Sequence, residues 1–203
     1  LALVLGPVLA AWGGLPRVFE VTAVMGGLGL MVVLFWLPAT PQLSDGGSAH
    51  IADRERLGEA LWGRGLGVLY GSIFCLHLLL MAAFTAIPSV MAEQVGLATE
   101  YHAWMYLATL CCAIPGVAIL VRRRREVDDP RPLLALTVLL TVLGLIVALG
   151  AVSLTLLGVG LVLFFAGFTA LETILPALVS IFAPLSLRGT AMGIFSSAQF
   201  LGV

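Results

Sequence analysis

The sequence contains no lysine, and charged residues of all kinds make up only 10% of its 203 residues. A soluble globular protein carries about a quarter charged residues and is about half apolar, whereas 61% of this chain is hydrophobic. One soluble domain of this length could not bury so much apolar surface. The composition therefore excludes a soluble globular protein and predicts an integral membrane protein.

Cysteine is scarce as well. Cys75, Cys111 and Cys112 lie in apolar runs without the spacing of a metal or redox motif, so we interpret them as small buried side chains. Nucleotide-binding loops, zinc-protease helices and an ordered nucleophile, histidine and acid are also missing from the sequence. We therefore expect a protein that is not an enzyme, with no catalytic residues, cofactor or metal. The lack of a soluble basic surface predicts no nucleic-acid partner.

Long apolar runs are what the chain has in abundance. Because a helix needs about 20 residues to cross the hydrocarbon core, we predict seven spans, the first and last incomplete, in a chain that is a segment of a longer protein. The runs do not alternate in polarity as barrel strands do, so the fold class is an all-α polytopic helical bundle. The expected spans cover residues 1–15, 18–37, 66–91, 101–121, 132–150, 153–182 and 189–203, with a turn at 150–153.

The arginines predict the orientation of these spans. Numbered along the chain, the even gaps between spans hold nine of the ten arginines, and only Arg17 lies in an odd gap. Since cytoplasmic loops are enriched in basic residues, the even gaps should face the cytoplasm. The cytoplasmic gaps would include the long polar stretch 39–65, in which 51–64 forms either an interfacial helix or a plain loop, and the basic run 122–125, which should touch anionic membrane lipids.

Glu172 is the only charged residue between Arg131 and Arg188. A charge at membrane depth is costly and normally faces a protein interior or a water-filled cavity. Pro176 lies four residues further on and lacks an N–H, so the carbonyl of residue 172 loses its helical partner. Beside Thr169 and Thr173, the carboxyl could exchange protons during function. The alternative is a structural carboxyl that is hydrogen-bonded to a neighbouring helix.

His77 lies close to the middle of the span at 66–91 and is the second proton-coupling candidate. Aromatic and hydroxyl side chains fall on or near its helix face, which suits a cavity for an amphipathic compound. The alternative is a histidine satisfied by one interhelical hydrogen bond. The substrate-cavity candidates are Tyr70, Phe74, Phe84, Thr85 and, on the last span, Gln199.

Small residues and prolines mark candidate positions for helix packing or gating. Gly189 and Gly193 form a small-residue face that serves either sliding or static packing. Gly6 and Pro7 should kink the first span or open its packing, and Pro176, which removes one helical hydrogen bond from the sixth, is a further candidate for packing or gating.

Four segments resemble one family. LGPVLAAWGG (5–14) resembles the Gly-Pro signature of the fifth helix in proton-coupled drug antiporters of the major facilitator superfamily. FCLHLLLMAAFTAIP (74–88) resembles the seventh helix of one bacterial branch. FFAGFTALETILPALVS (164–180) and LSLRGTAMGIFSSAQFLG (185–202) resemble its tenth and eleventh helices. The resemblance implies helices five to eleven of twelve: residues 1–38 end the first half, 39–65 form the cytoplasmic linker and 66–203 belong to the second half.

The resemblance also implies a function. Members of this branch are monomeric secondary transporters of the bacterial inner membrane that exchange a small molecule for protons by alternating access. A nutrient symporter or facilitator of the same superfamily is an alternative, and so is a membrane scaffold or receptor without a transport cycle.

Overall fold

The computed structural model describes residues 2–36, 58, 63–126 and 129–203. All regular structure in these ranges is helical, which confirms the predicted all-α fold class. Within these described ranges, five helices are long and apolar enough to cross a bilayer, so the chain is a multi-pass membrane protein. The chain divides into two compact units, 1–50 and 51–203, and each is described by itself.

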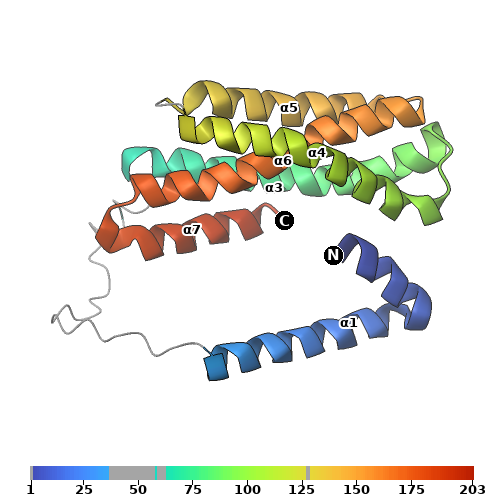
Figure 1. Ribbon diagram of the computed structural model, residues 1–203, viewed down its shortest axis with the longest axis horizontal. Coiled ribbons are helices and arrows are strands. Elements are labelled where there is room, and N and C mark those ends of the chain that lie inside the picture. The colour runs from blue at the N-terminus through green and yellow to red at the C-terminus, as the bar shows by residue number, and fades with distance from the viewer. Residues whose placement is uncertain (1, 37–57, 59–62, 127–128) are drawn as a thin grey trace. The chain divides into compact units, whose positions relative to one another are not determined.

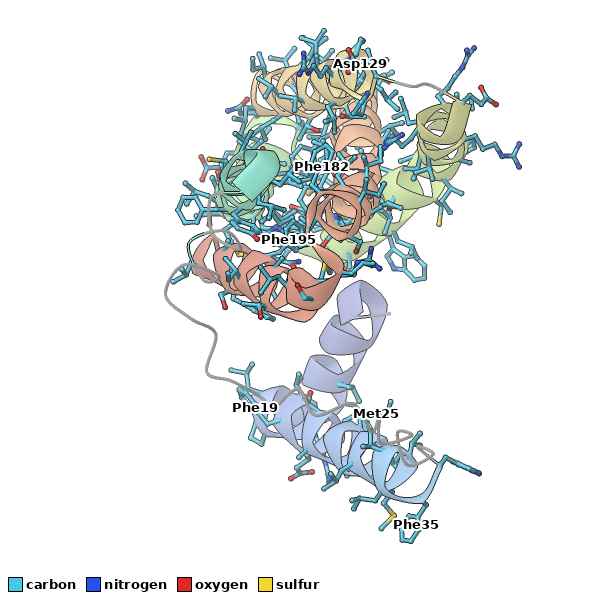
Figure 2. All side chains as sticks on the ribbon, turned by 90° about the vertical axis from the view of Figure 1, so that its left-hand side faces the viewer. Phe19, Met25, Phe35, Asp129, Phe182 and Phe195 are labelled. Carbon is cyan, nitrogen blue, oxygen red and sulfur yellow. The ribbon has the colours of Figure 1, made fainter. Side chains whose placement is uncertain are left out.

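The first unit consists of α1 (Ala2–Trp36). Its helix is interrupted at Gly13 and Gly14, and the latter has a φ of 71°, which favours glycine. The interruption lies inside the expected span 1–15, close to its end, and the segment Trp12–Trp36 is long and apolar enough to cross a membrane. Phe19, Met25 and Phe35 project from this segment (Figure 2), and all three are exposed within the unit.

The second unit carries the remaining helices, and their bounds agree with the expected spans. The turn predicted at 150–153 is confirmed, because one helix ends at Leu149 and the next begins at Leu154. α7 has 14 residues, fewer than the about 20 that cross a bilayer. The elements are α3 (Leu66–Ser89), the π-helical turn η2 (Val90–Gln94), η3 (Thr99–Tyr101), α4 (His102–Glu126), α5 (Arg131–Leu149), α6 (Leu154–Phe182), η4 (Leu185–Leu187) and α7 (Arg188–Leu201).

α6 is the central helix of this unit. It contacts α3, α4, α5 and α7 and runs through the middle of the bundle in Figure 1. Its interface with α5 is the most extensive, because Gly144, Gly160 and Gly167 let the two backbones approach closely. A Cβ atom at Gly160 would collide with the backbone of Ala148, and one at Gly167 with that of Thr141. Small residues commonly allow such close packing of membrane helices.

Two groups of sequence predictions concern the linker and the orientation of the spans. The linker 39–65 and its interfacial helix at 51–64 lie mostly outside the described ranges. The cytoplasmic position of the even gaps stays a prediction. It depends on the arginines, of which Arg122 and Arg123 are exposed at the end of α4.

Labelling of single cysteines from each side of the membrane should report this orientation. In a full-length protein without Cys75, Cys111 and Cys112, Glu100→Cys should react with a membrane-impermeant thiol reagent from the outside. Arg123→Cys should react only from the inside, because α4 lies between the two positions and both are exposed. Reversed labelling of this pair would contradict the orientation. Gly96 is a poorer position for a cysteine, because its φ is 72°.

Candidate functional site

Three polar side chains from three helices meet inside the second unit. His77 comes from α3, Glu172 from α6 and Gln199 from α7. The Gln199 Nε2 atom lies 2.9 Å from His77 Nε2 and 3.3 Å from Glu172 Oε1. The ring and the carboxyl are themselves 3.5 Å apart, measured from His77 Nε2 to Glu172 Oε1. The structure therefore joins both proton-coupling candidates and one cavity candidate in a single cluster.

The His77 ring is held on three sides. Its Nδ1 lies 3.2 Å from the carbonyl oxygen of Ile73, one turn earlier on α3. Phe168 of α6 packs against the ring with centroids 5.7 Å apart, and Gln199 contacts the Nε2 edge. Only 5% of the residue is exposed. The ring is thus fixed in place, and its Nε2 atom points to the other two members of the cluster.

Glu172 is more open than His77, with 40% of its side chain exposed against 7%. It opens onto a cavity of about 310 Å³ between α3, α6 and α7. The hydroxyl of Thr173 donates to the carbonyl of Thr169 and so does not bond to the carboxyl. The cavity is lined by Ile73, Thr169, Glu172, Thr173, Pro176, Met192, Phe195, Ser196 and Gln199.

The end of α7 is placed by a close contact with α3. Gly202 follows the helix, and its N–H donates to the carbonyls of Ala198 and Gln199. A Cβ atom at Gly202 would collide with the carbonyl of Phe74 and crowd His77. Glycine at this position therefore lets α7 approach α3 closely enough for Gln199 to reach the imidazole.

The other cavity candidates do not line the cavity at the cluster. Tyr70 is buried in α3, and Phe74 is exposed one turn before His77. Thr85 is exposed, and its hydroxyl donates to the carbonyl of Met81. Phe84 packs against Tyr106 of α4 with ring centroids 5.2 Å apart. These four residues thus lie elsewhere on or around α3.

Some cavity-lining residues were not singled out from the sequence. Met192 and Phe195 precede Gln199 by seven and four residues, so helical spacing places all three on one face of α7. Ile73 likewise precedes His77 by four residues, on the same face of α3. This spacing is the signal that could have found them, once Gln199 and His77 were known to face each other.

The packing candidates have different surroundings. Pro176 lies within α6 and lines the cavity. Among the described residues, nothing lies within 4 Å of a Cβ atom built at Gly189 or Gly193. Gly6 and Pro7 lie in α1, whose residues with non-helical backbone angles are Gly13 and Gly14, and their role in packing or gating stays a prediction.

A row of aromatic rings connects the cluster to α4. Phe168, which packs on His77, stacks on Phe164, and Phe164 packs edge-on against Phe165. Phe165 in turn contacts Tyr106, the partner of Phe84. Such tilted and edge-on arrangements are the favoured ones for aromatic pairs. The row fills the core between α3, α4 and α6 beside the cluster.

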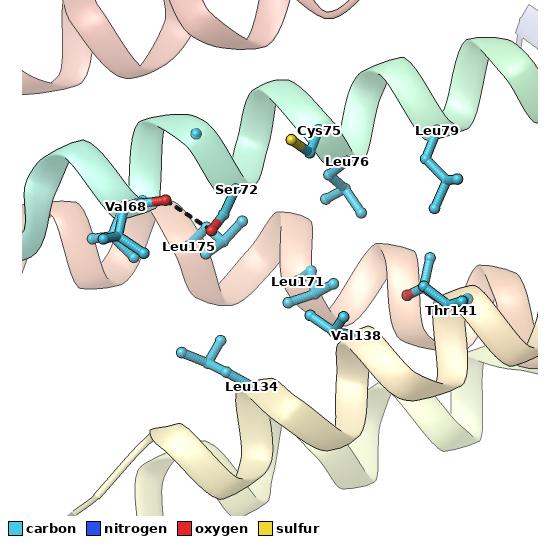
Figure 3. A pocket seen from close by; sticks show the side chains of 13 residues that line it. Val68, Ser72, Cys75, Leu76, Leu79, Leu134, Val138, Thr141, Leu171 and Leu175 are labelled. Atoms are coloured by element: carbon cyan, nitrogen blue, oxygen red, sulfur yellow. Dashed lines mark hydrogen bonds between the residues drawn. The ribbon is translucent and has the colours of Figure 1, made fainter.

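The larger cavities lie away from the cluster. One of about 540 Å³ lies between α3, α5 and α6 (Figure 3). Its lining is almost wholly aliphatic, and its hydroxyls are occupied: Ser72 donates to Val68 and Thr141 to Thr137. Another, of about 730 Å³, continues from it to Asp129 and Arg131. We assign the functional site to the smaller cavity because its lining includes Glu172 and Gln199, the two side chains that lie against the His77 ring.

Metal binding finds no support in the described part of the chain. No group of three histidine, cysteine, aspartate or glutamate residues there is arranged to hold a metal ion. The chemistry available at the cluster is hydrogen bonding and proton exchange between an imidazole and a carboxyl.

Comparison with known proteins defines the class. The family model of the Major Facilitator Superfamily matches residues 1–203, so the chain belongs to this superfamily, as the sequence motifs predicted. The chain is 32% identical to the inner membrane transport protein YajR of Escherichia coli (strain K12), covering all of this chain and 44% of YajR. It is 24% identical to the uncharacterized transporter BU466 of Buchnera aphidicola subsp. Acyrthosiphon pisum (strain APS), over all of this chain and 52% of that protein. The chain thus spans about half the length of these relatives.

Proposed function

We propose that the chain is part of a secondary transporter that exports a small amphipathic molecule in exchange for protons. Residues 1–38 and 66–203 belong to its two halves, which rock about a central site, and 39–65 connects them on the cytoplasmic side. The transporter acts as a monomer in a bacterial inner membrane, where it contacts lipids. Its superfamily and the transporter names of its relatives support this function.

The observation that carries the proposal is the cluster of His77, Glu172 and Gln199 in an otherwise apolar bundle. Burying a carboxylate at membrane depth costs about 2.5–3.5 kcal/mol on insertion scales. Glu172 reduces this cost by opening onto a cavity and by accepting a hydrogen bond from Gln199. A group held in this way can be ionised when water reaches the cavity and neutral when the cavity is closed.

Proton coupling then follows from a difference between two states of the transporter. When Glu172 is ionised, the favoured state of the transporter is the one in which water and the Gln199 amide reach the carboxylate. When Glu172 is neutral, the state in which they do not reach it is tolerated as well. Each 1.4 kcal/mol of this preference shifts the balance of the two states tenfold. A proton gradient can therefore drive the cycle in one direction without any chemical change in the substrate.

The proposal is tested by transport into vesicles that contain the full-length protein. A fluorescent amphipathic cation such as ethidium is the probe, and an acidic interior supplies the proton gradient. We expect ethidium to accumulate inside, since exchange for protons would carry it against its own gradient, and a protonophore should abolish this accumulation. Vesicles without protein control for leak. Accumulation that survives the protonophore would contradict proton coupling.

A further inference from the structure

We propose that Gln199 is a positioning residue that selects the protonation form of His77 and prevents its direct pairing with Glu172. The proposal deepens the assignment of the cluster, and its link to transport rests on the proposed function. Each contact of the cluster must pair a hydrogen-bond donor with an acceptor, and only one set of protonation states does this for all contacts.

The first step concerns the proton on the His77 ring. A backbone carbonyl only accepts hydrogen bonds, so the contact between His77 Nδ1 and the Ile73 oxygen requires the proton on Nδ1. The amide nitrogen of Gln199 only donates, so the His77 Nε2 atom 2.9 Å away must be unprotonated. Together these two partners define a neutral ring that carries its proton on Nδ1.

The second step concerns the amide. The nitrogen that contacts His77 Nε2 also donates to Glu172 Oε1 at 3.3 Å. If the amide were turned around, its oxygen would face the carboxylate oxygen, which also only accepts. The orientation with nitrogen towards both groups is therefore the one that satisfies an unprotonated Nε2 and an ionised Glu172 together.

The third step is the consequence of a proton on Nε2. This atom would then be a donor facing the Gln199 nitrogen, which is also a donor. Glu172 Oε1, 3.5 Å away, is the carboxylate oxygen that could accept this proton's hydrogen bond. No orientation of the Gln199 amide satisfies both a protonated Nε2 and an ionised Glu172, so the direct pair of ring and carboxyl requires Gln199 to withdraw. The position of α7 thus decides whether His77 and Glu172 pair directly.

No other described group near the ring competes for this role. α6 presents Glu172 and the apolar ring of Phe168 to His77, and α7 presents Gln199 and Gly202, which carry no charge. Tyr70, on α3 itself, lies about two turns away along the helix. Within the described residues, Glu172 is therefore the charged group that faces His77.

The test is the 15N spectrum of the His77 ring in the full-length protein in lipid bilayers. Histidine is labelled with 15N, and His50 and His102 are replaced by glutamine so that only the His77 ring is observed within this chain. At neutral pH we expect a protonated Nδ1 and an unprotonated Nε2. In Gln199→Leu the donor is lost, so Nε2 should become protonated in most molecules and donate to Glu172. Gln199→Glu should have the same effect, since a carboxylate in that place accepts.

Ser196→Ala is the matched control, because Ser196 lines the same cavity one turn earlier on α7. It should leave the His77 signals unchanged. A protonated Nε2 in the unaltered protein would overturn the proposal without any variant, and so would an unprotonated Nε2 in Gln199→Leu or Gln199→Glu. These signals require neither substrate nor a proton gradient. Failure of this inference is therefore distinguishable from failure of the proposed transport function.

Discussion

Replacing Glu172 by glutamine should abolish proton-driven accumulation while leaving exchange of substrate across the membrane. Glutamine keeps the shape of the side chain but cannot take up or release a proton. For one proton exchanged per substrate, a gradient of about one pH unit supports about tenfold accumulation, because tenfold corresponds to 1.4 kcal/mol. We expect this roughly tenfold ratio to fall to about one in Glu172→Gln, measured with ethidium in vesicles that hold the full-length protein.

Two further variants make this experiment specific. Glu172→Asp keeps a carboxyl one methylene shorter and should retain part of the coupling. Glu100→Gln makes the same chemical change at an exposed position in η3 and should accumulate ethidium normally. If Glu172 is a structural group instead, an amide can replace a neutral carboxyl in a hydrogen bond at little cost. Full coupling in Glu172→Gln would therefore remove this residue from the mechanism.

A side chain at Gly167 should strongly destabilise the bundle. Even the Cβ atom of alanine would collide with the Thr137 carbonyl and with the backbone of Thr141, which cannot move aside as a flexible side chain can. Overpacking of this kind costs about 1–3 kcal/mol, and leucine should cost more than alanine because it forces α5 and α6 further apart. The measurement is the thermal unfolding midpoint of the full-length protein in detergent.

Gly158→Ala is the matched control on the same helix. A Cβ atom there meets only the terminal methyl of Met105, at 3.4 Å, and a methionine side chain can shift. Both changes replace glycine by alanine within α6, so the gain in intrinsic helix propensity is the same and cancels in the comparison. Equal unfolding midpoints for Gly158→Ala and Gly167→Ala would show that the close contact with α5 does not contribute to stability.

The sequence predicted the helices well because the membrane sets their length. The uncharged run after Arg131 is too long for one span, which predicted a turn at 150–153 before α6. Ser153 caps the first turn of α6 by accepting a hydrogen bond from Leu156 N–H. The sequence predicted a span past Pro88 to residue 91 but not the π-helical turn η2 at its end. Nor did it predict the close packing of α5 on α6. Which glycines approach which backbone depends on the pairing of helices, and periodicity within one helix does not contain that information.

For the site, the sequence identified the chemical groups but not all of their neighbours. Glu172 and His77 were conspicuous because titratable residues are rare within apolar helices. Their meeting with Gln199, 122 positions after His77, could be found only from the packing of α7. Phe84 lies about 20° around α3 from His77 but about 10 Å further along it. A shared helix face therefore did not place Phe84 at the same cavity, and it contacts Tyr106 instead.

The tight contact between α5 and α6 also determines which helix of this bundle can be displaced most easily. Glu172 lies on α6, which should move little, because its glycines pack closely on the backbone of α5 and four helices surround it. Gln199 lies on α7, which is not part of this closely packed pair of helices. Any strain that a bound molecule or a proton creates in the cluster should therefore be released mostly as a displacement of α7. We therefore expect the Glu172 carboxyl to stay in place while the Gln199 amide moves with α7.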